Sequence, residues 1–179
     1  MSRIILVFGI AAGLIVAVPM CLMLANAEHG SAATSMFTGY LMMVLALSLI
    51  FVGVKRLRDR ELGGVIRFVP ALLAGLGISA VAGVIYVIGW EITLAVTDFA
   101  FVDSYSTAAV EAARAKGASA AEIEAVIANM DEFRRQYANP LFRLPVTFVE
   151  IFPVGCIISL ISAGLLRNSR FLPARAWAA

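Results

Sequence analysis

Glu150 has the clearest chemical potential in the chain, because it is an acid within the apolar run of residues 144–166. A charged side chain at the centre of a membrane costs about 2.5–3.5 kcal/mol on insertion scales, unless it is paired, hydrated or protonated. Such a carboxylate can carry a proton or bind a cation, as a transporter or channel requires. It can also accept hydrogen bonds from an arginine, a tyrosine or a tryptophan and lock two helices together. Both interpretations are open, and the helix lock is the simpler one.

Three other polar residues could share a site with Glu150. Arg143 lies seven residues earlier on the same helical face, at about 100° per residue. Tyr86 and Glu91 lie at the end of another apolar run, residues 68–90, where Tyr86 and Trp90 are typical of an interfacial aromatic belt. If the two runs form neighbouring helices, the side chains of Glu150, Arg143, Glu91 and Tyr86 would surround a wet cavity open to the outside.

Other reactive residues show no catalytic or metal-binding pattern. His29 is the single histidine, and Cys21 and Cys156 lie in apolar runs without the spacing of a metal knuckle or a disulfide framework. No nucleophile–base pair and no phosphate-binding glycine loop is recognisable. The sequence therefore predicts no metal, no cofactor and no enzymatic activity.

The amino-acid composition indicates that the segments carrying these residues lie in a lipid membrane. The 179 residues are 61% hydrophobic and 15% charged, with a mean hydropathy of +0.93. Soluble domains contain about 45–50% apolar and about 25% charged residues. This difference excludes an ordinary cytosolic enzyme, a disordered chain and a soluble nucleic-acid-binding protein. The length is that of one domain, so residues 1–179 are expected to form a single membrane domain.

Four apolar runs are long enough to span a membrane, which takes roughly 20 helical residues. They are continuous, whereas the strands of a membrane barrel alternate between apolar and polar residues. The sequence thus predicts an all-α integral membrane bundle of four transmembrane helices, at residues 4–24, 36–54, 68–90 and 144–166.

The first run has an alternative interpretation as a signal peptide, because Ala25-Asn26-Ala27 has the form of a cleavage site. Its apolar part is about 21 residues, longer than the 7–15 typical of a signal peptide. This length favours a retained membrane helix.

Charge around the runs predicts the orientation. Arg3, the loop 55–67 and the tail 167–175 carry basic residues, and all lie on one side of a four-span bundle. Because Lys and Arg mark the cytoplasmic side, both termini are expected to be cytoplasmic. The cluster 55–60 could also bind anionic lipid headgroups, but the topology signal is the simpler interpretation. No aromatic platform accompanies the cluster, so nucleic acid is not expected as a partner.

The acid-rich loop before the fourth span is predicted to form an extracytoplasmic helical hairpin over residues 103–138. Gly117 ends its first helix, and Ser119 and Glu122 have the spacing of a capping box that starts the second. The apolar stripe of the second helix could pack against the preceding helix, the membrane interface or another protein. The simplest is a hairpin folded over the outer end of its own bundle. The stripe contains Ile123, Val126, Ile127, Met130 and Phe133.

Small residues recur along three of the spans, a pattern typical of closely packed membrane helices. At about 100° per residue, Glu150 lies roughly opposite the small residues of its own helix. Both faces should avoid lipid, which favours a homo-oligomer, although Pro153 can kink the helix and change this register. The small residues are Gly9 and Gly13, then Gly75, Ser79 and Gly83, and finally Gly155, Ser159 and Ala163.

The fourth run contains Glu150-x-x-Pro153-Val154-Gly155 followed by Ser159-Leu160-Ile161-Ser162-Ala163. With this motif, the basic loop after the second run, the glycine-containing third run and Asn139-Pro140, the chain resembles the bacterial membrane proteins of domain-of-unknown-function family 4199. The resemblance covers most of the chain and implies a four-span protein of the bacterial inner membrane. It supplies no activity, ligand or catalytic residue.

These features favour a non-enzymatic accessory or scaffold protein that acts through its bundle faces and its hairpin. The alternative is a small proton- or cation-coupled transporter or channel that uses Glu150. The expected partners are membrane lipids, a second copy of the chain and a protein bound at the hairpin.

Overall fold

The computed structural model describes residues 1–25 and 36–174, so Asn26, Ala27 and His29 lie outside the described residues. Within these ranges every regular element is helical, which confirms the predicted fold class. The elements are α1 (Ser2–Ala25), α2 (Met36–Leu47), α3 (Leu49–Arg56), the π-helical turn η1 (Leu57–Glu61), α4 (Phe68–Val96), α5 (Ala100–Ala115), α6 (Ala120–Ala138) and α7 (Pro140–Leu166).

Four stretches are long and apolar enough to cross a membrane: Ser2–Leu24, Gly39–Glu61, Phe68–Val96 and Pro140–Leu166. The third runs six residues beyond its predicted end, and the fourth begins four residues before its predicted start. Asn139 caps the fourth helix, because its side chain accepts a hydrogen bond of 3.0 Å from the backbone amide of Leu141. Pro140 follows at the first helical position, where a missing amide proton costs nothing. Arg143 therefore lies within α7.

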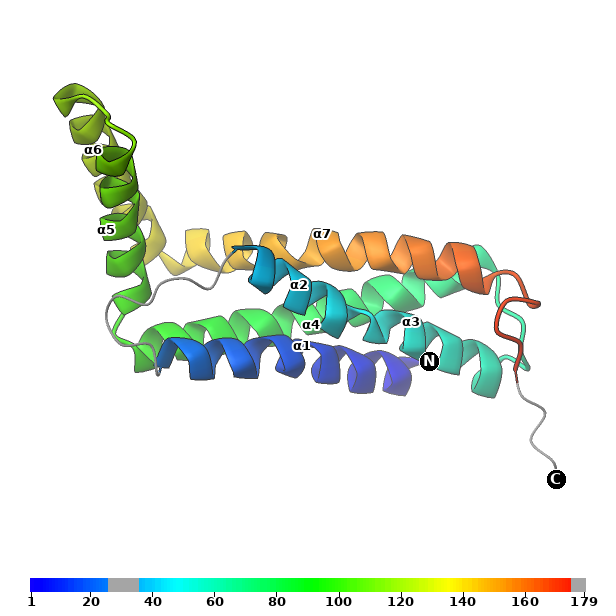
Figure 1. Ribbon diagram of the computed structural model, residues 1–179. Coiled ribbons are helices and arrows are strands. Elements are labelled where there is room, and N and C mark those ends of the chain that lie inside the picture. The colour runs from blue at the N-terminus through cyan, green and yellow to red at the C-terminus, as the bar shows by residue number, and fades with distance from the viewer. Residues whose placement is uncertain (26–35, 175–179) are drawn as a thin grey trace.

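The second span is two helices in series, broken at Ser48. The hydroxyl of Ser48 donates to the backbone oxygen of Leu45 at 2.6 Å. Serine side chains compete in this way with the backbone for hydrogen-bonding partners. Beyond α3, the wider turn η1 places the basic residues 55–60 at the end of the bundle where the N-terminus lies (Figure 1).

Helix α4 is the central element, because it packs along both α1 and α7 (Figure 1). A Cβ added to Gly9 would lie 2.5 Å from Cβ of Val81, closer than real Cβ atoms approach. A Cβ on Gly75 would lie 2.8 Å from Cβ of Ser159. The small residues thus allow the backbones of these helices to approach closely. The fully buried core residues around them include Leu47, Ile50, Ile78, Ile151 and Leu166.

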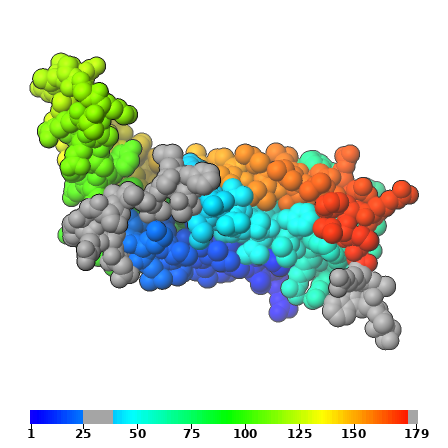
Figure 2. Space-filling view, in the orientation of Figure 1, coloured from blue at the N-terminus to red at the C-terminus, as the bar shows by residue number. Residues whose placement is uncertain are grey.

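The hairpin α5–α6 projects from the end of the bundle opposite the N-terminus (Figures 1 and 2). The expectation that it folds over that end is wrong. Within residues 1–25 and 36–174, the hairpin packs against the bundle mainly through its base, where Val102 and Tyr137 are buried beside Trp90 and Leu94 of α4. The rest of the hairpin stands clear, because α5 and α6 pack mainly against each other.

Candidate functional site

The antiparallel helices α4 and α7 are joined by polar contacts at three successive levels. The level nearest the hairpin is a bidentate ion pair, in which Arg143 donates from Nε to Oε1 of Glu91 at 2.7 Å and from Nη2 to Oε2 at 2.6 Å. Its Nη1 donates to the backbone oxygen of Tyr137 at 2.9 Å. The guanidinium lies 5.2 Å from the centre of the Phe99 ring. All three guanidinium nitrogens of Arg143 therefore donate hydrogen bonds.

The turn between α4 and α5 places Phe99 against Arg143. Asp98 and Phe99 both have positive φ angles, 47° and 60°, in the left-handed region that costs about 1–3 kcal/mol for residues other than glycine. This turn redirects the chain from the bundle into the hairpin. Sequence patterns do not reveal it, since neither residue type favours this conformation as glycine does.

The second level contains Glu150. The hydroxyl of Tyr86 donates to Oε2 of Glu150 at 3.3 Å. Tyr86 is 3% exposed, whereas Glu150 is exposed. Since Tyr86 precedes Glu91 by five residues, this pair lies about 7 Å deeper in the bundle than the ion pair. Among the described residues Glu150 forms no ion pair, and Arg143 is committed to Glu91.

The third level is a pair of hydroxyls. Oγ of Ser79 and Oγ of Ser159 lie 3.2 Å apart, and both side chains are buried. Each hydroxyl has a single proton, which it can donate either across this contact or to the backbone oxygen four residues earlier, at Gly75 and Gly155 respectively. The two glycines and two serines therefore form one contact, in which the missing Cβ atoms make room for the hydroxyls.

The structure divides the four predicted polar residues into two pairs, Glu91–Arg143 and Tyr86–Glu150. The small residues of α7 are buried, whereas Glu150, about 180° from Ser159 around the helix, is exposed. The long side chain of Glu150 reaches Tyr86 of α4 from the edge of the interface. The face of α7 that carries Ile157 and Ile161 is not covered within the described residues, and both side chains are exposed.

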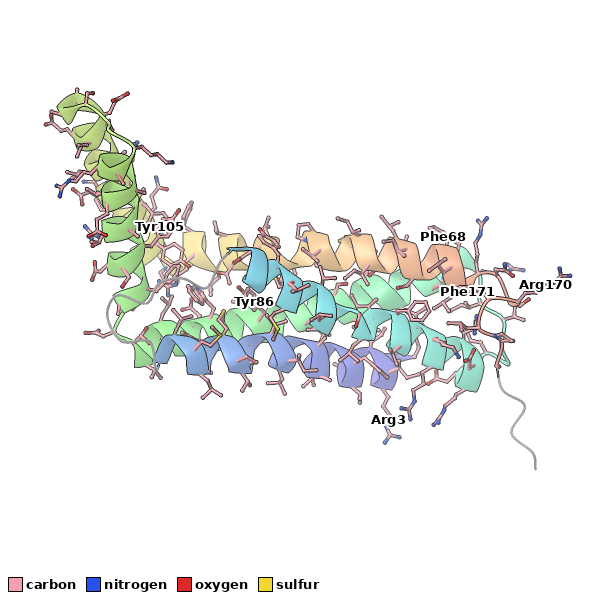
Figure 3. All side chains as sticks on the ribbon, viewed as in Figure 1. Arg3, Phe68, Tyr86, Tyr105, Arg170 and Phe171 are labelled. Carbon is pink, nitrogen blue, oxygen red and sulfur yellow. The ribbon has the colours of Figure 1, made fainter. Side chains whose placement is uncertain are left out.

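A pocket of about 290 Å³ adjoins the second level. Tyr86 lies inside the bundle at the end nearer the hairpin (Figure 3). Trp90 Nε1 donates to the hydroxyl of Tyr137 at 2.6 Å, and the Trp90 ring meets Phe101 edge to face at 4.9 Å. Five aromatic side chains and one carboxylate contribute to the wall: Tyr40, Tyr86, Trp90, Phe101, Tyr137 and Glu150.

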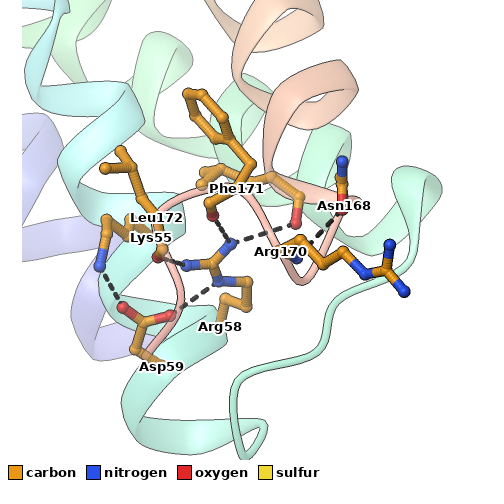
Figure 4. Close-up of polar contacts among 8 residues, drawn as sticks. Lys55, Arg58, Asp59, Asn168, Arg170, Phe171 and Leu172 are labelled. Atoms are coloured by element: carbon orange, nitrogen blue, oxygen red, sulfur yellow. Dashed lines mark hydrogen bonds and ion pairs between the residues drawn. The ribbon is translucent and has the colours of Figure 1, made fainter. Parts of the chain in front are cut away.

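A second polar cluster lies at the opposite end of the bundle, around the fully buried Arg58 (Figure 4). Arg58 donates to Oδ1 of Asp59 at 2.7 Å and to the backbone oxygens of Phe171 at 2.9 Å and Leu172 at 2.5 Å. Lys55 pairs with the same carboxylate. Arg58 thus ties the chain after α7 to η1.

In the sequence, Arg58 is recognisable only as part of the basic cluster 55–60. The available signal was Asp59, an acid among basic neighbours, which indicates that some of these cations have an internal partner. Beside the cluster lies a groove of about 660 Å³, and its wall includes apolar residues, three basic residues and Asp59, which pairs with Lys55. A site for an anionic lipid headgroup in this groove stays an alternative interpretation.

The hairpin carries the predicted apolar stripe between its two helices. Ile123, Val126, Met130 and Phe133 are half-buried, and Ile127 is 41% exposed. A groove of about 240 Å³ runs beside Ile127. Charges of both signs border it: Glu111, Arg114, Asp131 and Arg134.

The capping box at the start of α6 is present. Ser119 Oγ accepts from the backbone amide of Glu122 at 3.4 Å, and Glu122 Oε2 accepts from the backbone amide of Ser119 at 2.7 Å. Ser119 donates to the Glu122 carboxylate from its backbone amide and also from Oγ at 2.8 Å, and these two hydrogen bonds lower the pKa of Glu122 below its usual value. In the described part of the chain, no group of three or more His, Cys, Asp or Glu residues could hold a metal ion.

One family model matches residues 7–168, and its description reads "Protein of unknown function (DUF4199)". The match includes the three levels between α4 and α7, the hairpin and Arg58. It confirms the resemblance seen in the sequence. Comparison with curated proteins and with solved structures gives no match.

Proposed function

The chain belongs to the DUF4199 family, and we propose that this member is a non-enzymatic accessory or scaffold protein of the bacterial inner membrane. It has four candidate transmembrane helices, as a multi-pass membrane protein requires. The hairpin would be the element by which it recognises another protein.

The observation that carries this proposal is the projection of α5–α6 away from the bundle (Figure 1). Two helices cannot enclose an apolar stripe completely, and Ile127 remains 41% exposed in the groove. An apolar strip bordered by charges of both signs resembles the centre and polar rim of a protein interface.

Orientation determines where the partner would lie. The N-terminus, Arg3 and Phe171 lie at the end of the bundle opposite the hairpin (Figures 1 and 3), and the buried Arg58 donates to the backbone oxygen of Phe171. The positive-inside rule assigns that basic end to the cytoplasm, so both termini would be cytoplasmic and the hairpin extracytoplasmic.

Site-specific photocrosslinking in intact cells tests the hairpin. A photoreactive amino acid at position 127 should form an adduct with one defined protein. The matched control is position 125, which is exposed about 200° around the same helix. Equal labelling from both positions, or labelling of lipid alone, would overturn the proposal.

A second candidate function is proton- or cation-coupled transport that uses Glu150. It is favoured by the position of this carboxylate, which borders a pocket and has only the Tyr86 hydroxyl as a hydrogen-bonding partner among the described residues. In proteoliposomes, wild-type protein should show an ion or proton flux that Glu150→Gln abolishes while the protein stays folded. Absence of flux in the wild type under every gradient would rule out this candidate.

A further inference from the structure

Residues from four helices of the bundle and from the hairpin line the pocket beside Glu150. Helices α1, α2, α4 and α7 all contribute residues to its wall, and the base of the hairpin contributes Phe101 and Tyr137. Its volume of about 290 Å³ is at the lower limit of typical small-molecule sites, about 300–1,000 Å³. It therefore suits a compact ligand.

The charge on the wall has one sign. Glu150 is the one charged residue among those that line the pocket in the described part of the chain. The nearby Arg143 is already bonded to both oxygens of Glu91 and to a backbone oxygen. The pocket therefore attracts a cation and repels an anion.

The neutral part of the wall also favours a cation. The five aromatic side chains are Tyr40, Tyr86, Trp90, Phe101 and Tyr137. The faces of aromatic rings carry partial negative charge and attract a cation that contacts them. Four methionines complete the wall, and their flexible thioethers adapt to apolar ligands of different shape: Met20, Met23, Met42 and Met43.

The hydrogen bonds leave one acceptor for a ligand. Tyr86 donates to Oε2 of Glu150, and Oε1 of the same carboxylate has no hydrogen bond within the described residues. One carboxylate among aromatic and thioether groups is a poor replacement for the water shell of a small inorganic ion. It matches an organic cation, whose apolar body the same walls can cover.

We propose that this pocket is a binding site for an organic monocation with an apolar body, such as an alkyl- or arylammonium. The charged nitrogen lies beside Glu150 and the rings of Tyr86 and Trp90, and the apolar part contacts the methionines. The inference is independent of the hairpin. It gives the second candidate function a ligand class, but binding requires no transport.

Tryptophan fluorescence of the purified full chain in detergent can test binding. The chain has two tryptophans, and Trp177 lies outside the described residues, so Trp177→Phe leaves Trp90 as the single reporter. The probe is benzyltrimethylammonium, and its neutral analogue is neopentylbenzene, which has carbon in place of the charged nitrogen. We expect a saturable change in Trp90 fluorescence with the cation and an affinity at least tenfold weaker for the neutral analogue.

Variants assign the effect to the pocket. Glu150→Gln should weaken binding of the cation at least tenfold, whereas Glu124→Gln, which removes an exposed acid of the hairpin, should leave it unchanged. If Glu150→Gln fails to fold, Tyr40→Leu tests the same wall, because Tyr40 is 44% exposed and its replacement should disturb the fold little. This variant should weaken binding of the cation at least threefold.

Three results would overturn the proposal: no saturable binding, equal affinity for the cation and its neutral analogue, or undiminished affinity in the pocket variants. Equal affinity would show that the pocket binds neutral apolar ligands as well as cations. Because the measurement needs no gradient, absent flux in proteoliposomes would remove the transport candidate alone.

Discussion

Arg143 and Glu91 form a bidentate ion pair at the end of the bundle where the hairpin begins, and the side chain of Arg143 is only 6% exposed. The pair connects α4 to α7, and a third donor of the arginine connects both to the end of α6. Because Arg143 pairs with Glu91, Glu150 has the Tyr86 hydroxyl as its hydrogen-bonding partner among the described residues. One contact therefore both anchors the hairpin and determines the charge of the neighbouring pocket.

Removing the acid of this pair should destabilise the protein more than removing both charges. Glu91→Ala leaves a buried guanidinium without its counterion, for which a cost of about 2–4 kcal/mol is expected. The double variant Glu91→Ala, Arg143→Met removes the buried charge and should recover part of that loss. Thermal unfolding in detergent measures both. A single variant as stable as the wild type would contradict the role of the pair.

The contact between α4 and α7 should be intolerant of one methyl group. A Cβ on Gly155 would lie 2.6 Å from Oγ of Ser79, so Gly155→Ala should cost about 1–3 kcal/mol of stability. Gly164→Ala is the matched control on the same helix, because nothing lies within 4 Å of its added Cβ. Unfolding in detergent should show a loss for the first variant and no loss for the second. Equal behaviour would show that the helices do not pack as described.

Arg58 should hold the segment after α7 against η1. Arg58→Gln removes hydrogen bonds to the backbone oxygens of Phe171 and Leu172 and leaves these acceptors unpaired. We expect limited proteolysis to cleave residues 168–174 at least tenfold faster in this variant. The exposed Arg56→Gln is the control and should be cleaved at the wild-type rate. Equal rates for all three proteins would rule out this role.

The first turn of α6 should lose stability in acid. The pKa of Glu122 is lowered in the folded state by hydrogen bonds from Ser119. A group with a lowered folded pKa stabilises the fold above its unfolded pKa, about 4.3 for glutamate, and this contribution is lost as the pH falls through the folded value.

The NMR chemical shift of the Ser119 amide proton reports this hydrogen bond directly. It should move with a midpoint below the usual glutamate range. In Glu122→Gln, whose side chain can still accept from Ser119 but does not titrate, this movement should disappear. A midpoint at or above the usual range would contradict the capping geometry.

The sequence alone determined the four spans, the helical hairpin with its capping box and the stripes of small residues. Each depends on residues close together in the chain: an apolar run must form a helix in lipid to satisfy its own backbone. Ser119 and Glu122 need only the three-residue spacing that a helix start supplies. Glu150 also stood out locally, as an acid among apolar neighbours.

Tertiary structure alone decided which partner each polar residue has. One residue changes direction by about 100° around a helix, so the pairing of Glu91 with Arg143 depends on how α4 and α7 are rotated and shifted against each other. The burial of Arg58 also depends on tertiary structure, because its partners lie more than 100 positions later in the chain. The left-handed turn at Asp98 and Phe99 directs the hairpin away from the bundle and leaves its stripe only partly covered. The local sequence indicates whether a residue lies in lipid or in water, but the relative placement of the helices determines which residues it contacts.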